Sequence, residues 1–180
     1  REEDGYCTTL QGHTDSVYSV TQLTDGRIAS GSAGGTIKIW NLKKGREEDG
    51  YCTTLQGHIN SVVSVTQLTD GRIASRSLDK TIKIWDLNID PGQYGYCTTL
   101  QEHVGFISSV TQLTDGRIAS GSFDKTIKIW DLKKSPGEDG HCTTLKRYTT
   151  EICSATQLTD GRIASGSSDG TINIWGATSE

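Results

Sequence analysis

Serine, histidine and aspartate, the three side chains of a hydrolase triad, recur along this chain at a fixed spacing. Two complete sets occur, and they are His58, Ser75 and Asp79, and His103, Ser120 and Asp124. A serine activated by a histidine that a carboxylate orients can attack an acyl group, so hydrolase chemistry is one hypothesis. A tryptophan accompanies each set, at Trp85 and Trp130. A set that repeats along the chain with an added tryptophan indicates a scaffold element instead of one active site.

Two incomplete versions of this pattern stand in the first and last parts of the chain. The first has His13, Ser30 and Trp40, with Gly34 at the aspartate position. The last has Ser165, Asp169 and Trp175, with Tyr148 at the histidine position. The choice of serine stays open, because a second serine lies on the same strand face in every copy, at Ser32, Ser77, Ser122 and Ser167.

Other catalytic and metal-binding chemistry lacks its sequence signature. The chain contains no nucleophile elbow, no phosphate-binding Gly-X-Gly-X-X-Gly loop, no HEXXH stretch and no CXXC pair. Four of the five cysteines occupy equivalent positions on predicted outer strands, far from one another, at Cys7, Cys52, Cys97 and Cys142. Asp25-Gly26 is a hairpin turn signal, not a calcium ligand. We therefore predict a protein that is not an enzyme and holds no metal or cofactor.

Composition limits the possible partners. The chain has 18 basic and 22 acidic side chains and a net charge of −4, without the basic face that a nucleic-acid-binding protein needs. No stretch approaches the roughly 20 apolar residues of a membrane-spanning helix. Because no secretion signal is recognisable and the cysteines are not placed to pair, we expect free thiols and a cytoplasmic location.

The organisation of the chain is a fourfold repeat of 45 residues. The copies are 1–45, 46–90, 91–135 and 136–180, and they align without an insertion. The segments CTTL and TQLTDGRIAS recur unchanged in all four copies. Self-similarity at this period is typical of a four-stranded β-propeller blade, so we treat residues 1–180 as one repeat domain.

Local signals in each copy predict strands and no helix. In the first copy we expect strands at Ser16 to Leu23, Arg27 to Ser32, Thr36 to Leu42 and, as an outer strand, Tyr6 to Gln11. Turns are expected at Thr24-Asp25-Gly26 and Ala33-Gly34-Gly35, where glycine can take a positive φ. The alternation of Ile37 and Ile39 with Trp40 suits a sheet that is covered on both faces.

These motifs resemble those of the WD-repeat β-propeller family over the whole chain. Gly57-His58 precedes Trp85-Asp86, and SGSFDKTIKIWD runs from Ser120 to Asp131. The resemblance implies antiparallel four-stranded blades, each with a hydrogen-bonded tetrad of histidine, serine, aspartate and tryptophan. Two tetrads would be complete, and the two partial ones would tie their blades less tightly.

The family also implies a rim that binds proteins or peptides. The copies differ most in the loops of that rim, and the candidate binding residues are Tyr18, Ile59, Arg76, Val104, Phe106, Arg147, Tyr148 and Glu151. Sequence drift on a solvent-facing loop is the alternative explanation, and the sequence alone leaves both open.

Closure of the propeller is the remaining problem. Propellers of this family have seven or eight blades, and four blades would have to splay by about twice the usual angle to close alone. Two chains would give eight blades at the usual angle. We therefore predict a homodimer in which the N-terminal outer strand of one chain pairs with the last blade of the other and removes two open edges.

Three classes of function follow. The first is a non-catalytic scaffold that assembles into a closed propeller and binds an unknown protein or peptide, but no nucleic acid and no membrane. The second is a purely structural or engineered repeat protein with no natural ligand, which the near-identity of the copies favours. The third is a hydrolase that uses the serine, histidine and aspartate network.

Overall fold

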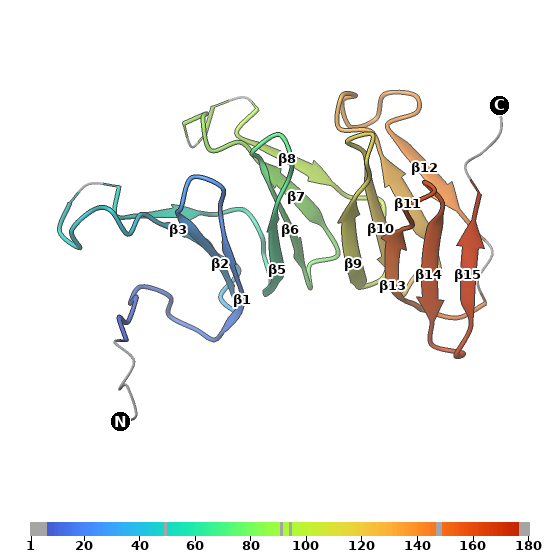
Figure 1. Ribbon diagram of the computed structural model, residues 1–180, viewed down its shortest axis with the longest axis horizontal. Coiled ribbons are helices and arrows are strands. Elements are labelled where there is room, and N and C mark those ends of the chain that lie inside the picture. Colours follow the sequence, from blue (N-terminus) through green and yellow to red (C-terminus); the bar gives the residue numbers. More distant parts are fainter. Residues whose placement is uncertain (1–6, 49, 91, 94, 147–148, 177–180) are drawn as a thin grey trace.

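In the computed structural model, the chain folds into four antiparallel β-sheets that stand in a row (Figure 1). The structure describes residues 7–48, 50–90, 92–93, 95–146 and 149–176. We name the sheets blades 1 to 4 in chain order. Blade 1 consists of β1 (Val17–Gln22), β2 (Ile28–Ser32), β3 (Ile37–Trp40) and β4 (Cys52–Leu55). Blade 2 consists of β5 (Val62–Gln67), β6 (Ile73–Ser77), β7 (Ile82–Trp85) and β8 (Cys97–Leu100).

Blades 3 and 4 repeat this order, with one difference in strand number. Blade 3 consists of β9 (Ile107–Gln112), β10 (Ile118–Ser122), β11 (Ile127–Trp130) and β12 (Cys142–Leu145). Blade 4 has three strands, β13 (Ile152–Gln157), β14 (Ile163–Ser167) and β15 (Ile172–Trp175). The predicted all-β class and propeller-type blades are confirmed. No helix that could cross a membrane occurs in the described part of the chain.

Each blade is a meander whose neighbouring strands pair in antiparallel register. The first hairpin turns at Gly26, which has φ 88°, and the amide of Leu23 donates to the carbonyl of Arg27 at 2.8 Å. Glycine adopts this left-handed conformation without steric strain, which explains the Asp-Gly pair at the turn. Successive loops of the meander lie on opposite rims of the blade. The loop before β1 and the loop between β2 and β3 therefore lie on the same rim.

The hydrophobic core lies between the blades. Ile37 and Ile39 of β3 are 0% and 2% exposed, and they pack with Val62 and Val65 of β5. Trp85 of blade 2 belongs to the same cluster. Because side chains alternate across a strand, each sheet presents one apolar set to each neighbour. A blade therefore buries the apolar side chains of both its faces only when a neighbouring blade packs on each face.

A glycine on the second strand of blades 1 and 3 lets the next blade approach closely. A β-carbon at Gly31 would lie 2.7 Å from Cγ1 of Val62, and one at Gly121 would lie 2.7 Å from Cγ2 of Ile152. Blade 2 has Arg76 at the equivalent position, and its guanidinium donates to the carbonyl of Ile107 at 2.8 Å. Blades 2 and 3 accordingly meet more sparsely, through β6 and β9, whereas β1 packs directly on β5 and β9 on β13.

In blades 1 to 3, the outer strand comes from the sequence repeat that follows the one supplying the other three strands. Blade 4 has no such strand within the described residues, and the four sheets do not close into a ring (Figure 1). The prediction of a strand at Tyr6 to Gln11 is wrong for residues 7–11, which form no strand in this chain, and Tyr6 lies outside the described residues. The equivalent segments β4, β8 and β12 each pair with the third strand of the preceding repeat, which is β3, β7 or β11. The remaining third strand is β15, and it lies in the blade at the opposite end of the row from residues 7–11.

Candidate functional site

A chain of four side chains joined by hydrogen bonds crosses blade 2. Trp85 Nε1 donates to Ser75 Oγ at 2.8 Å, and Ser75 Oγ lies 2.8 Å from His58 Nε2. His58 Nδ1 lies 2.7 Å from Asp79 Oδ2. Blade 3 repeats this arrangement with the same three distances, and its members are His103, Ser120, Asp124 and Trp130. The structure thus brings together all four side chains of both complete sets.

The proton positions in this network follow from burial and charge. Burial lowers the pKa of His58, and the hydrogen bond with Asp79 offsets only part of that effect. Burial raises the pKa of Asp79, but the hydrogen bonds from Thr81 and His58 outweigh it and leave that pKa below its ordinary value. The carboxylate is therefore ionised and the imidazole neutral at pH 7, with the proton on Nδ1. Nε2 then accepts from the hydroxyl of Ser75, which in turn accepts from Trp85.

The order of contacts is that of a hydrolase triad, but the serine cannot meet a substrate in this arrangement. Ser75 is 2% exposed and Ser120 is 0% exposed, and an indole N–H already occupies each hydroxyl oxygen. A nucleophile needs a free approach for the acyl carbon and donors for the developing oxyanion. A buried, fully satisfied polar network instead rigidifies the fold around it.

The incomplete sets keep part of the network. In blade 1, His13 Nε2 lies 2.7 Å from Ser30 Oγ, which also accepts from Trp40 Nε1 at 2.8 Å. Because Gly34 has no carboxylate, the partner of His13 Nδ1 among the described residues is Thr36 Oγ1, at 3.4 Å. In blade 4, Trp175 Nε1 donates to Ser165 Oγ at 2.7 Å, and Asp169 accepts from Thr171 and Thr150. Tyr148 lies outside the described residues.

Two parts of the network were missing from the sequence prediction. A threonine two residues after the aspartate donates to it, as Thr81 does to Asp79 Oδ1 at 2.7 Å. An aromatic side chain also stacks edge-on against each buried tryptophan, as Tyr96 does on Trp85 with ring centroids 5.9 Å apart. The invariant threonine of the TI dipeptide was a usable signal for the first. The constant spacing of eleven residues between each of these tryptophans and its aromatic partner, at Tyr51, Tyr96 and His141, was a usable signal for the second.

The second serine of each strand has a separate role. Ser77 Oγ donates to the carbonyl of Asn60 at 3.0 Å and accepts from the amide of Asp79 at 3.1 Å. It therefore ties the rim loop before β5 to the turn that carries Asp79. The geometry thus separates the two serines: Ser75 contacts the histidine and the tryptophan, and Ser77 contacts the backbone.

The candidate rim residues form one cluster and several separate positions. Phe106 packs edge-on against Phe123 at 5.2 Å, and the Arg76 guanidinium lies 5.6 Å from the Phe106 ring centre. Ile59 and Val104 are 92% and 78% exposed and occupy equivalent loops of blades 2 and 3. The cluster does not include Tyr18, which lies within β1, or Glu151, whose carboxylate accepts from Ser168. Arg147 and Tyr148 fall outside the described residues.

Four segments of the chain match the family described as WD domain, G-beta repeat, at residues 5–41, 50–86, 95–131 and 139–176. The chain belongs to the WD40 repeat family. Among solved structures it is similar to the crystal structure of the WD40 beta propeller domain of Doa1, with a TM-score of 0.73 and 26% sequence identity. That match covers 95% of this chain and 54% of the other, so the chain spans about half of the length it matches. No curated protein gave a significant match.

WD40 propellers are typically protein-interaction scaffolds, so membership of the family favours binding over catalysis. The buried serines agree with this, because they leave the rim loops and the grooves between blades as the accessible surfaces.

Completing the WD40 tetrad of blade 1 should stabilise it. Gly34→Asp places a carboxylate beside His13 Nδ1, and a β-carbon at Gly34 meets only ordinary contacts of 3.7 Å or more. We expect an increase of about 1.5 kcal/mol in the free energy of unfolding, the lower end of the range for a hydrogen bond to a charged group. Urea unfolding measures it. Asp79→Gly, the reverse change in blade 2, should lower the free energy of unfolding. A Gly34→Asp variant less stable than the wild type would contradict the role assigned to the carboxylate.

The buried histidines should make stability depend on pH. Burial lowers the pKa of His13, His58 and His103 below 6.5. Below about pH 6.5 these histidines are therefore protonated more in the unfolded chain than in the folded chain. The free energy of unfolding therefore falls as the pH drops from 6.5, by up to about 1.4 kcal/mol per pH unit for each of the buried His58 and His103. The partly exposed His13 contributes less, because solvent screens its charge. Urea midpoints between pH 7.5 and 5 measure it.

The double variant His58→Gln/His103→Gln should show a shallower slope in that window. The control is Asp115→Asn, because the hydrogen bond from Arg117 holds the pKa of this turn carboxylate below its ordinary value, outside the window. Equal slopes in the wild type and the histidine variant would rule the histidines out as the cause.

Proposed function

We propose that two copies of this chain close into an eight-bladed WD40 ring, and that the ring is a non-catalytic scaffold that holds another protein on its rim. The observation that carries the closure is the exposure of repeat-equivalent apolar residues at the two ends of the row. Ile172 and Ile174 of β15 are 74% and 45% exposed, whereas their equivalents Ile82 and Ile84 are 0% and 2% exposed.

The other end of the row has the matching face. Val17 and Val20 of β1 are 47% and 66% exposed, whereas Val62 and Val65, at the same repeat positions, are 0% and 4% exposed. At the junction of blades 1 and 2, the isoleucines of β3 pack on those two valines of β5. The exposed face of blade 4 is therefore complementary to the exposed face of blade 1, which supports a second copy as the occupant of both.

A polar contact follows the same periodicity. At each junction a glutamine carbonyl oxygen accepts the amide of a turn threonine in the preceding blade, at 2.8 Å, and the pairs are Gln67 with Thr24, Gln112 with Thr69, and Gln157 with Thr114. Gln22 and Thr159 are the equivalents at the two ends. In the proposed ring, Gln22 of one copy accepts the amide of Thr159 of the other.

The outer edge of blade 4 supports the same arrangement. Residues 7–10 carry the CTTL sequence that forms β4, β8 and β12, and β15 has a free edge in the described chain. In the ring, Cys7 to Leu10 of one copy pairs with β15 of the other, so that two open edges are covered. Four blade faces of about 400 Å² each give a buried area of about 1,600 Å², the size of a standard specific interface.

Light scattering on the purified 180-residue chain tests the closure. We expect about twice the 19.5 kDa mass of one chain. Ile174→Glu should return the mass to 19.5 kDa, because a charge would be buried without a partner at the junction. Ile59→Glu adds the same charge on the rim and should leave the dimer intact. A wild-type mass of one chain would disprove the ring.

Gly166→Ala gives a second, smaller perturbation of the same junction. A β-carbon at Gly166 meets nothing within 4 Å in the single chain, whereas its equivalent at Gly121 would meet Ile152 at 2.7 Å. The alanine should therefore weaken the dimer without unfolding the subunit. A dimer of unchanged affinity would mean that Gly166 faces solvent.

The scaffold part of the proposal is supported by the rim of blades 2 and 3. Aromatic residues and arginine are the types that concentrate binding energy at interfaces, and Arg76, Phe106 and Phe123 lie in contact there. Phe123 is 46% exposed and Val104 is 78% exposed, so the cluster extends into an apolar surface. We call Val104, Phe106 and Phe123 the rim patch.

A paired pull-down tests the rim patch. Proteins that the immobilised chain retains should be lost with Val104→Ser/Phe106→Ser. They should be kept with Leu42→Ser, which removes an apolar side chain of 52% exposure from the opposite rim. Thermal melts check that both variants fold. If both variants retain the same proteins as the wild type, the rim patch is not the binding surface.

A further inference from the structure

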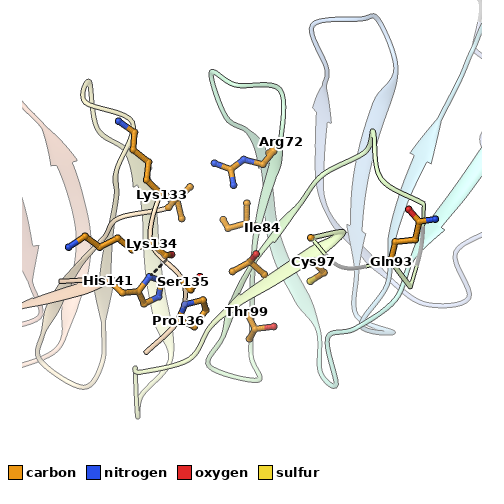
Figure 2. Close-up of a pocket in the computed structure, with 13 residues that line it drawn as sticks. Arg72, Ile84, Gln93, Cys97, Thr99, Lys133, Lys134, Ser135, Pro136 and His141 are labelled. Carbon is orange, nitrogen blue, oxygen red and sulfur yellow. Dashed lines mark hydrogen bonds between the residues drawn. The ribbon is translucent and has the colours of Figure 1, made fainter. Parts of the chain in front are cut away.

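A cavity lies between blades 2 and 3, away from the rim patch. Its volume is about 620 Å³. One wall is the loop after β11, with Lys133, Lys134 and Pro136, and the other wall carries Ile84 and Thr99 of blade 2 (Figure 2). Arg72 stands at the mouth near Lys133 (Figure 2). We call this cavity the lateral groove.

From its chemistry and geometry, we propose that the lateral groove binds an extended acidic peptide, with peptide carboxylates on Lys133 and Lys134 and the peptide backbone along the outer edge of β8. This inference deepens the proposed scaffold role by naming a class of partner, and it does not depend on closure of the ring.

The width of the groove has a cause in the fold. Arg76 occupies the position at which Gly31 and Gly121 let neighbouring blades approach, and blades 2 and 3 meet sparsely as a result. The equivalent cavity between blades 1 and 2 is only about 230 Å³, and Ile89 and Tyr96 line it. The lateral groove has Lys134 and His141 at those two positions.

The two equivalent cavities also differ in charge. Each contains one arginine that is paired with an aspartate of its own turn at 2.7 Å, Arg27 with Asp25 and Arg72 with Asp70. Beyond that pair, the cavity between blades 1 and 2 has the acidic Asp90, whereas the lateral groove has two lysines and, among the described residues that line it, no acidic one. The same backbone thus presents opposite charges at neighbouring junctions, and the lateral groove selects an acidic ligand.

The position of β8 favours a peptide over a small anion. β8 is the outermost strand of its sheet, and Cys97, Thr98 and Thr99 of this strand line the groove (Figure 2). A free strand edge offers backbone donors and acceptors that an extended peptide can pair with. The Lys134 ammonium donates to the carbonyl of Asp139 at 2.7 Å, and a peptide carboxylate could draw it into the groove, where Lys133 is already exposed.

Fluorescence anisotropy with a labelled hexaglutamate peptide tests the proposal. We expect saturable binding to the 180-residue chain that weakens as salt is raised. Lys133→Asn/Lys134→Ile should weaken it about tenfold, the effect expected from two surface ion pairs. The second repeat already carries Asn88 and Ile89 at these positions, so its backbone accepts them. If this variant fails to fold, Lys133→Gln/Lys134→Gln provides the same measurement.

The matched control is Lys80→Gly/Lys125→Gly, which removes the same two charges from the opposite rim. Both lysines have a positive φ of about 70°, and glycine stands at these positions in the first and fourth repeats, so the control should fold well. It should change the affinity less than about twofold. An equal loss in both variants would show non-specific attraction and overturn the proposal.

Competition separates a peptide site from a site for free anions. Inorganic phosphate and free glutamate, each at the concentration of the peptide's carboxylates, should displace little of the labelled peptide. Full displacement by either would overturn the peptide assignment. Val104→Ser/Phe106→Ser should leave hexaglutamate binding unchanged, so failure of the rim patch and failure of the lateral groove give different results.

Discussion

Every blade of this protein depends on its neighbours to cover both of its faces. The alternation of side chains along each strand gives one apolar set to each face, and the hydrophobic core consists of clusters between sheets. A sheet of this kind gains little stability alone, because its apolar residues stay in water until a second sheet packs on them. Exposed isoleucine and valine at the two ends of the row are therefore a direct consequence of the repeat, and they are the main reason for proposing a second copy as the partner of both ends.

Polar networks and apolar packing stabilise this structure at different levels. The His58 network ties the loop before β5 to the turn between β6 and β7, so it fixes the shape of one blade. The contacts of Ile37 and Ile39 with Val62 fix how two blades sit together. The fold of one blade therefore tolerates an incomplete hydrogen-bond network, as in blade 1. The packing between two blades changes with a single bulky side chain, as Arg76 shows at the junction of blades 2 and 3.

Much of the fold was predictable because its signals are local. The first strand was expected at Ser16 to Leu23 and is found at Val17–Gln22, and the Asp-Gly turn lies where expected. The histidine, serine, aspartate and tryptophan sets recur at constant spacing, and the resemblance to the WD-repeat family indicated that these residues form a network. Contacts between blades were not predictable in the same way. The contact of the Arg76 side chain with blade 3 and the unpaired segment at residues 7–11 both depend on which blade stands beside which, and no local pattern encodes that.

The offset between repeat and blade has a consequence for the number of blades. Since β4, β8 and β12 each belong to the 45-residue copy after the one that supplies the rest of their blade, one such copy of the sequence is not the unit that packs. Gain or loss of one whole 45-residue unit leaves every hydrogen-bonded ladder inside the chain intact. The number of blades can therefore change by whole units without breaking a strand pairing inside the chain.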